Sequence, residues 1–376
     1  MMRRCFILPG LAAVQLCLAA CSFLPVNPVA GKTQLSGQEA VTLENRYLKL
    51  TAVPGTMGAI SSLCWLPGKS EFFKDYKYSC TSINELLPEQ KTVTVWGNRT
   101  LVWNGTVLFY QPMAKFAVNT AEEAVSLQMS GKFIGGLPIE ISRKVTLEKD
   151  SALVKIAVTV TNFGKTEQDV RLWEHLVPNQ EGSIPDVSLI CGDGVRRLGR
   201  YQDTEKHSKG LIVDTFKDGN LNRYFVPGAD WVAATGGKTP LTVFLRTDEK
   251  NLAQDGFFYT QKDAVAKIHT VEILLKSLKI APGKSQTVEV EMGVLSNLKT
   301  LRRLTKNYGF DFSLANGTLK WHASTLKPQN SRKMLAKAGS WQQEFIIPAL
   351  VPGKSASGTI TGVPAVNNEN VEFTEK

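Results

Sequence analysis

Residues 137–179 carry the clearest alternation of apolar and polar positions in the chain. Apolar side chains recur there at every second position, interrupted once at Arg143, and two polar turns at 148–151 and 162–165 divide the runs. A period of two is typical of β-strands, because successive side chains of a strand point to opposite faces. The pattern therefore predicts three consecutive antiparallel strands, the last of which ends at His175.

Alternation of the same kind extends to both sides of this meander. Short alternating runs, separated by turns rich in glycine, proline and asparagine, begin at Val41 and continue to Leu295. Such runs predict an all-β fold. The length allows one large β domain or two of ordinary size.

Residues 298–376 predict a small C-terminal extension. The stretch LKTLRRLTKNY at 298–308 repeats leucine at a spacing of three and carries cations, which predicts one short helix. A linker follows, and then two strands at 343–347 and 357–360 that are joined through a Pro-Gly turn. We expect the polar tail to dock on the sheet edge or to stay partly loose.

The first 20 residues have the features of an export signal. Two arginines precede a short apolar run, and the sequence LAAC then ends at Cys21. This segment resembles the lipobox of bacterial lipoproteins, and the resemblance implies that Cys21 carries the lipid anchor. Ser22 stands where an Asp would mark inner-membrane retention, so the resemblance implies the outer membrane. A plain signal peptide cleaved elsewhere is the alternative, and it also leads to export.

Residues 21–40 are rich in Pro, Gly, Ser and Thr and show no period, which predicts a flexible tether between lipid and domain. No later apolar run reaches the length of about 18 residues that a membrane helix needs. We therefore expect a protein of the bacterial cell envelope that is held at the membrane by its lipid.

The charge balance limits the classes of molecule that the protein is expected to bind. The chain has 44 Lys and Arg against 34 Asp and Glu, a net charge of +10. The excess is scattered and is not interleaved with aromatic residues, so no nucleic-acid surface is expected. A solvated surface explains it, and an anionic partner such as a polysaccharide or lipid headgroups is the alternative.

The cysteines leave one pairing open. Three of the six lie within the first 21 residues, whereas Cys64 and Cys80 are 16 positions apart and Cys191 stands by itself. In an oxidising compartment Cys64 and Cys80 form a candidate disulfide, and buried thiols are the alternative. No cysteine or histidine spacing is typical of a metal site, so we predict no metal and no cofactor.

Three segments point to a known family. Leu43-Glu44-Asn45, Pro54-Gly55 and the run GAISSL at 58–63 resemble the opening hairpin of the galactose mutarotase-like superfamily, the fold of aldose epimerases. They also resemble the start of the periplasmic domain of the bacterial membrane protein insertase. The meander and a closing hairpin at 278–295 continue the likeness. It implies one large antiparallel β-supersandwich over residues 41–297.

The resemblance also indicates candidate catalytic residues. In epimerases of this superfamily a His at such a strand end is the general acid, and His175 with Asn179 matches this pattern without its aromatic pair. Opening a sugar hemiacetal needs an acid and a base on the sugar. Glu272, on a late strand where some of these families keep a sugar-contacting Glu, is the candidate base. Epimerases carry a further His in the first half, and no His precedes His175.

Aromatic residues beside polar ones are the candidate sugar contacts. Trp96 and Trp103 flank a stretch that contains Arg99, and Trp173 lies two positions before His175. A tryptophan ring stacks on a sugar ring while arginine and asparagine hold its hydroxyl groups. The alternative is that the tryptophans belong to the hydrophobic core.

These observations predict an envelope lipoprotein whose supersandwich binds carbohydrate without catalysis. A protein-interaction or assembly module, related in fold to the insertase domain, and an aldose 1-epimerase-like enzyme are the alternatives. If His175 and Glu272 lie within one sugar's width in an open cleft, an enzyme or a sugar-binding protein is favoured. If both are buried and their polar atoms are satisfied, the assembly module is favoured.

The lipid anchor is tested by Cys21→Ser. Without the thiol no acyl chain is attached, and each buried methylene group contributes about 0.8 kcal/mol to membrane binding. We expect the variant in the soluble fraction after cell lysis, whereas Ser22→Ala stays with the membrane. Membrane association of the Cys21→Ser variant would refute the anchor.

Overall fold

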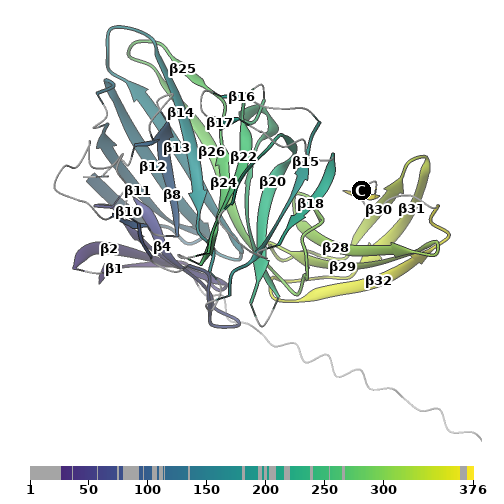
Figure 1. Cartoon of the computed structure of the whole chain (residues 1–376). Coiled ribbons are helices and arrows are strands. Elements are labelled where there is room, and N and C mark those ends of the chain that lie inside the picture. Colours follow the sequence, from purple (N-terminus) through teal and green to yellow (C-terminus); the bar gives the residue numbers. More distant parts are fainter. Residues whose placement is uncertain are drawn as a thin grey trace, which may run out of the picture.

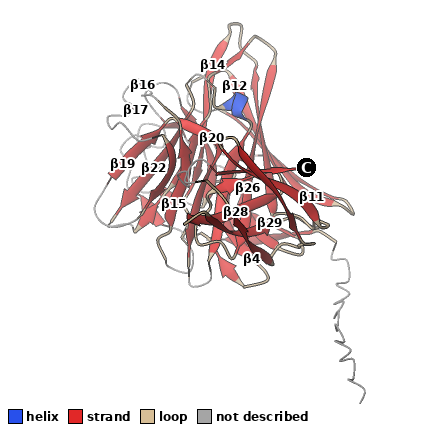
Figure 2. Ribbon diagram, turned by 90° about the vertical axis from the view of Figure 1, so that its right-hand side faces the viewer, coloured by secondary structure: helices blue, strands red, loops and turns tan. Residues whose placement is uncertain are grey.

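The computed structural model of the chain describes residues 27–35, 37–56, 58–73, 76–78, 93–95, 97–103, 108–109, 113, 115–133, 136–179, 183–193, 197–198, 201–202, 209–215, 221–237, 240–253, 255–264, 267–364 and 371–376. Strands dominate these residues, and the helical part among them is one 3₁₀ turn at Glu249–Asn251 (Figure 2). None of the described segments is a helix long and apolar enough to cross a membrane.

Two large antiparallel sheets form the main sandwich (Figure 1). The first sheet has the order β1 (Val29–Leu35), β2 (Gln38–Glu44), β3 (Leu48–Val53), β4 (Ala59–Trp65), β8 (Asn98–Trp103), β14 (Gln168–Leu176), β24 (Val271–Leu274), β22 (Phe257–Asp263) and β19 (Leu221–Phe225). Short strands extend it, namely β5 (Ser70–Glu71), β9 (Leu108–Phe109), β23 (Ile268–His269) and β25 (Leu278–Ile280).

The second sheet packs against the first. Its order is β10 (Lys115–Thr120), β11 (Ala124–Lys132), β12 (Ile139–Glu148), β13 (Leu153–Asn162), β26 (Ser285–Ser296), β21 (Leu241–Thr247), β20 (Pro227–Gly236), β15 (Asp186–Cys191) and β18 (Gly210–Asp214). Two small ribbons pair β6 (Tyr76–Tyr78) with β7 (Val93–Val95) and β16 (Arg197–Leu198) with β17 (Tyr201–Gln202). The all-β supersandwich expected from the sequence is confirmed.

The predicted three-stranded meander is only partly present. β12 and β13 pair as expected, but β14 leaves them and pairs with β8 and β24 of the first sheet. Asn162 holds the corner, because its Nδ2 donates to the carbonyl oxygens of Thr166 and Ile280, each at 2.8 Å. Alternation along a strand is the same in either sheet, so the pattern does not show which sheet the third strand joins.

Arg143, which interrupts the apolar pattern, points into the core. It lies on β12, and its Nη2 is 3.0 Å from Oε1 of Glu174 on β14 of the opposite sheet, with both side chains at most 1% exposed. Glu174 also accepts hydrogen bonds of 2.6 Å from Asn98 Nδ2 and Thr100 Oγ1, and Arg143 Nη1 donates to the Gly58 carbonyl at 2.6 Å. Burial lowers the pKa of Arg143, and the carboxylate of Glu174 opposes that shift.

The N-terminal boundary differs from the expectation. The predicted tether extended to residue 40, whereas β1 pairs along its full length with β2, from Val29 opposite Glu44 to Leu35 opposite Gln38. β1 is an edge strand with mostly exposed side chains, so backbone hydrogen bonds rather than apolar alternation hold it. A polar edge strand has no hydrophobic period by which a sequence reveals it.

The C-terminal extension is a second β unit with its own core. One sheet has the order β27 (Arg303–Leu304), β28 (Tyr308–Ala315), β29 (Thr318–Thr325) and β32 (Ser355–Thr361), and the other has β31 (Trp341–Ile347), β30 (Arg332–Ala338) and β33 (Val371–Glu375). Figure 1 shows these strands as a separate group beside the main sandwich. The two predicted strands fall inside β31 and β32, and the last residues form β33 rather than a loose tail.

The predicted helix at 298–308 is wrong. Residues 298–302 are irregular, and β27 and β28 follow. Leu298 and Leu301 are fully buried against Trp231, Phe244 and other apolar residues on the outer face of the second sheet. Burial of these leucines on a sheet outweighs the weak helical preference of a short segment.

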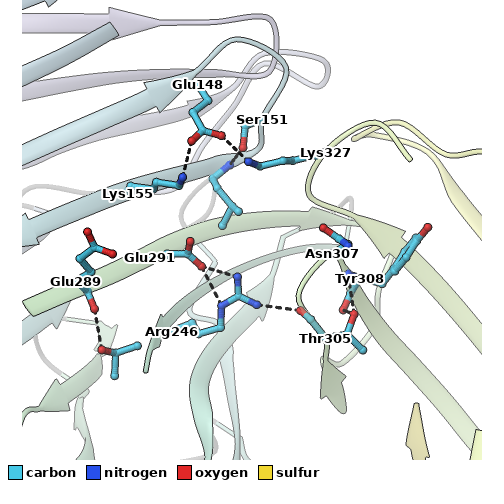
Figure 3. A network of polar contacts seen from close by, with 12 residues as sticks. Glu148, Ser151, Lys155, Arg246, Glu289, Glu291, Thr305, Asn307, Tyr308 and Lys327 are labelled. Atoms are coloured by element: carbon cyan, nitrogen blue, oxygen red, sulfur yellow. Dashed lines mark hydrogen bonds and ion pairs between the residues drawn. The ribbon is translucent and has the colours of Figure 1, made fainter. Parts of the chain in front are cut away.

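Polar contacts fasten the two units together (Figure 3). Lys327 forms an ion pair with Glu148 of β12, which also pairs with Lys155 at 2.5 Å. On the neighbouring strands Arg246 pairs with Glu291 and donates from Nη1 to the Thr305 carbonyl at 2.9 Å. The C-terminal unit is therefore anchored at several points of the second sheet.

The buried ion pair generates a stability prediction. Arg143→Met leaves the Glu174 carboxylate uncompensated in the core, so we expect the free energy of unfolding to fall by about 3–5 kcal/mol. The double variant Arg143→Met/Glu174→Gln keeps an acceptor for Asn98 and Thr100 without the charge, and it should recover part of the loss. Urea unfolding measures both values.

Lys49→Met is the matched control, because its ion pair with Glu44 is 48% and 35% exposed. Its cost should stay below about 1 kcal/mol. If the double variant loses at least as much free energy of unfolding as Arg143→Met and Glu174→Gln lose together, the uncompensated charge is not the cause of the loss.

Candidate functional site

A row of polar and aromatic side chains crosses the outer face of the first sheet. Strand register places Arg99 opposite His175, His175 opposite Glu272, Glu272 opposite Tyr259, and Tyr259 opposite Tyr224. Because Glu174 points into the core, its neighbour His175 must point out of it. We call these five residues the outer row.

Aromatic rings pack beside the outer row on the same face. The indole of Trp173 meets the rings of Phe257 and Tyr259 edge-on, at centroid distances of 5.6 and 5.5 Å. Its Nε1 donates to Glu272 Oε2 at 2.7 Å. Trp103 lies farther along this face, with the guanidinium of Arg171 5.2 Å from its ring. The row is therefore backed by a packed aromatic cluster.

His175 and Glu272 are in direct contact. His175 Nε2 lies 3.3 Å from Glu272 Oε1 and 3.4 Å from Arg99 Nη2, and His175 and Glu272 are 6% and 2% exposed. Burial raises the pKa of Glu272 to about 8, although Thr270, Arg99 and Trp173 favour its charged form. Burial, and then Arg99, hold the pKa of His175 well below its usual value. Both groups are therefore neutral at pH 7.

Two atoms of this pair lack a hydrogen bond, Nδ1 of His175 and Oε1 of Glu272, among the described residues. Both atoms are buried. A buried polar atom without a partner costs about 1–3 kcal/mol. Native proteins keep few such atoms, so each one calls for a structural or functional reason.

The structure brings five of the predicted site residues together. Arg99, Trp103, Trp173, His175 and Glu272 all lie on the outer face described above. Asn179 lies apart from the row, beyond the end of β14, and its backbone N–H donates to the Phe72 carbonyl at 2.6 Å. Trp96 falls outside the described residues.

The role expected for the tryptophans is corrected. Trp103 and Trp173 are only 3% and 1% exposed, so they form core with Leu101, Leu274 and the neighbouring rings. They are not exposed stacking platforms. The sequence pattern shows which face of the sheet a residue shares, but it does not show whether that face is covered.

The cysteine predictions have different outcomes. Cys64 is a free thiol on β4 in this structure, and burial raises its pKa. Cys80, its expected partner, lies outside the described residues, and so does Cys21. Among the described residues Cys64 forms no disulfide, and its pairing with Cys80 stays a prediction.

The accessible ends of the face were missed by the sequence interpretation. At one end Arg171 forms an ion pair of 2.5 Å with Asp255, and the two side chains are 18% and 29% exposed. At the other end Tyr224 is half-buried, Gln261 is half-buried and Asn222 is exposed. Asn222 pairs in register with Gln261, and positions two apart on a strand share a face. Because residues 171, 173 and 175 are two positions apart on one strand, the sequence could have placed Arg171 on the same face as Trp173 and His175.

The geometry at His175 and Glu272 bears on catalysis. An epimerase holds its acid and base apart, so that one reaches the ring oxygen and the other the anomeric hydroxyl. Two groups 3.3 Å apart leave no space for a sugar between them. Among the described residues, no group of three His, Cys, Asp or Glu side chains is arranged as metal ligands.

Comparisons with known proteins give the fold. No protein-family model and no curated protein matches the sequence. A putative aldose 1-epimerase from Klebsiella pneumoniae aligns with a TM-score of 0.50 at 10% identity, over 71% of this chain and 83% of its own. A galactose mutarotase-like protein from Clostridium acetobutylicum aligns with a TM-score of 0.48 at 11% identity, over 72% and 99%.

A longer protein matches as well. A TPR-domain containing protein from Parabacteroides distasonis aligns with a TM-score of 0.50 at 13% identity over 68% of this chain, which spans 47% of that protein's length. Identities this low concern the fold alone. The chain shares the β-sandwich fold of the putative aldose 1-epimerase from Klebsiella pneumoniae.

Proposed function

We propose that the protein is a lipid-anchored component of the bacterial cell envelope whose sandwich binds a carbohydrate without catalysis. The anchor is Cys21, in the outer membrane. The observation that carries the binding proposal is the accessible end of the outer row, where the ring of Tyr224 lies on the same face as the amides of Asn222 and Gln261. An aromatic face flanked by amides matches the apolar face and the hydroxyl groups of a sugar.

The neutral state of Glu272 and His175 supports an uncharged sugar as the ligand. Glu272 lies opposite Tyr259 in the strand register, and the ring of Tyr259 lies 4.9 Å from the ring of Tyr224 between centroids. A protonated carboxyl and a neutral imidazole add no net charge to the row next to Tyr259. Direct contact between the two groups argues against an epimerase.

A protein-interaction module of the envelope is the second candidate. It is favoured by the burial of His175 and Glu272, which are 6% and 2% exposed. Binding of any sugar would distinguish the carbohydrate-binding protein from the interaction module.

The carbohydrate proposal is tested by a thermal-shift screen with neutral monosaccharides, followed by calorimetry on the best one. Tyr224→Ala removes the ring and should weaken binding about fivefold or more, since an aromatic contact contributes on the order of 1 kcal/mol. Tyr224→Phe keeps the ring and should bind like the wild type. If no neutral sugar binds in either measurement, the carbohydrate proposal is refuted and the interaction module remains.

The neutral pair predicts a pH dependence of stability. Glu272 has a folded-state pKa of about 8, above its unfolded value, so the folded protein binds more protons between these two values. Stability should therefore fall as pH rises toward 8. The lowered pKa of His175 acts in the opposite direction, but only below its ordinary value of 6.5.

The window between about pH 6.5 and 8 isolates Glu272. Urea unfolding at several pH values should show the wild type losing stability across this window, whereas Glu272→Gln stays level. Equal slopes for both proteins would show that Glu272 is already ionised at neutral pH.

A further inference from the structure

A cavity of about 420 Å³ lies at the start of the C-terminal unit. Its walls come from the junction segment, residues 297–302, and from strands β28 and β29. Pockets for small ligands usually measure about 300–1,000 Å³. The cavity is therefore large enough for one or two sugar rings.

The junction segment presents its polar residues to this cavity because its leucines are buried. Leu298 and Leu301 are fully buried on the second sheet, and Lys299 and Thr300 between them line the cavity. Asn297, in the left-handed region at φ 62°, donates from its backbone to the Pro240 carbonyl at 2.8 Å and from Nδ2 to the Gly353 carbonyl at 3.4 Å. The wall is thus held from both units.

The opposite wall is set by strand register. Asp311 of β28 pairs with His322 of β29, and Ser313 pairs with Lys320. Side chains of paired residues lie side by side on one face of a sheet. Phe312 and Trp321, at the alternate positions, belong to the core of the C-terminal unit, and Phe312 also lines part of the cavity. The four polar side chains therefore face the cavity together.

The cavity carries an excess of positive charge. Asp311 is paired with Arg302 at 3.1 Å, which cancels one charge of each sign. In the described part of the chain, Lys299 and Lys320 have no carboxylate within 4.0 Å. Their side chains are exposed to solvent and available to a ligand. Hydroxyl groups of Thr300 and Ser313 complete the polar lining.

We propose that this cavity binds a sugar that carries an anionic substituent, a phosphate or a carboxylate. The ammonium groups of Lys299 and Lys320 supply charge-assisted hydrogen bonds to the anion. The two hydroxyl groups and the Asn297 amide match the hydroxyl groups of the ring. This site is separate from the outer row, whose central pair is neutral, and it does not depend on the function proposed there.

Calorimetry with four probes tests the proposal on the purified protein. Glucose 6-phosphate and glucuronate represent the two anionic substituents, glucose lacks the charge, and inorganic phosphate lacks the ring. We expect one or both anionic sugars to bind at least about tenfold more tightly than inorganic phosphate, because the ring adds hydrogen bonds. Raising the salt concentration should weaken this binding.

Variants assign the binding to this cavity. Lys299→Ala/Lys320→Ala should weaken anionic-sugar binding at least about tenfold, since each lost charge-assisted hydrogen bond contributes about 1.5–3 kcal/mol. Lys279→Ala/Lys284→Ala removes the same charge from exposed positions outside the cavity and should leave binding unchanged. Tyr224→Ala in the outer row should also leave it unchanged.

Three results would overturn the proposal. The first is that neither anionic sugar binds. The second is that inorganic phosphate binds as tightly as the sugars. The third is that Lys279→Ala/Lys284→Ala weakens binding as much as Lys299→Ala/Lys320→Ala does. Because the neutral-sugar screen reports on Tyr224 and these titrations report on Lys299 and Lys320, failure of one site is distinguishable from failure of the other.

Discussion

The buried ion pair between Arg143 and Glu174 is the interaction on which the rest of the structure depends. It joins one strand of each sheet across the core, with both side chains at most 1% exposed. Two buried charges tolerate no other register, because a shift by one residue moves each of them to the wrong face. With Glu174 directed inward, Trp173 and His175 are directed outward, and the composition of the outer face follows from the composition of the core.

Burial then determines the chemistry of that outer face. A low dielectric disfavours charge on Glu272 and His175, so two residues of opposite usual charge face each other as neutral groups. The aromatic cluster around Trp173 excludes water and keeps them so. The features that a ligand reaches lie at the ends of the face, at Tyr224 and at Arg171 with Asp255. The recognition function proposed above depends on these ends of the face.

The same competition between local pattern and burial shapes the junction. Leucines at a spacing of three favoured a helix, but a flat apolar sheet surface beside Trp231 and Phe244 accepts them in an irregular chain. The polar residues between Leu298 and Leu301 are then turned toward β28 and β29. Burial of the two leucines on the second sheet thus leaves the polar residues of the junction segment to line a polar, basic cavity.

The sequence by itself determined most strands of the main sandwich and the all-β class, because period-two alternation and turn residues are local signals. The resemblance to mutarotase-like domains, rather than the alternation, made His175 and Glu272 the candidate pair. In the sequence Arg143 was only an interruption of the apolar pattern, and the predicted tether included the residues that form β1. Only the tertiary structure decided which sheet β14 joins, that Trp103 and Trp173 are core, and that residues 298–376 fold as a second unit. Those outcomes depend on which surfaces meet, and burial between distant segments leaves no periodic trace along the chain.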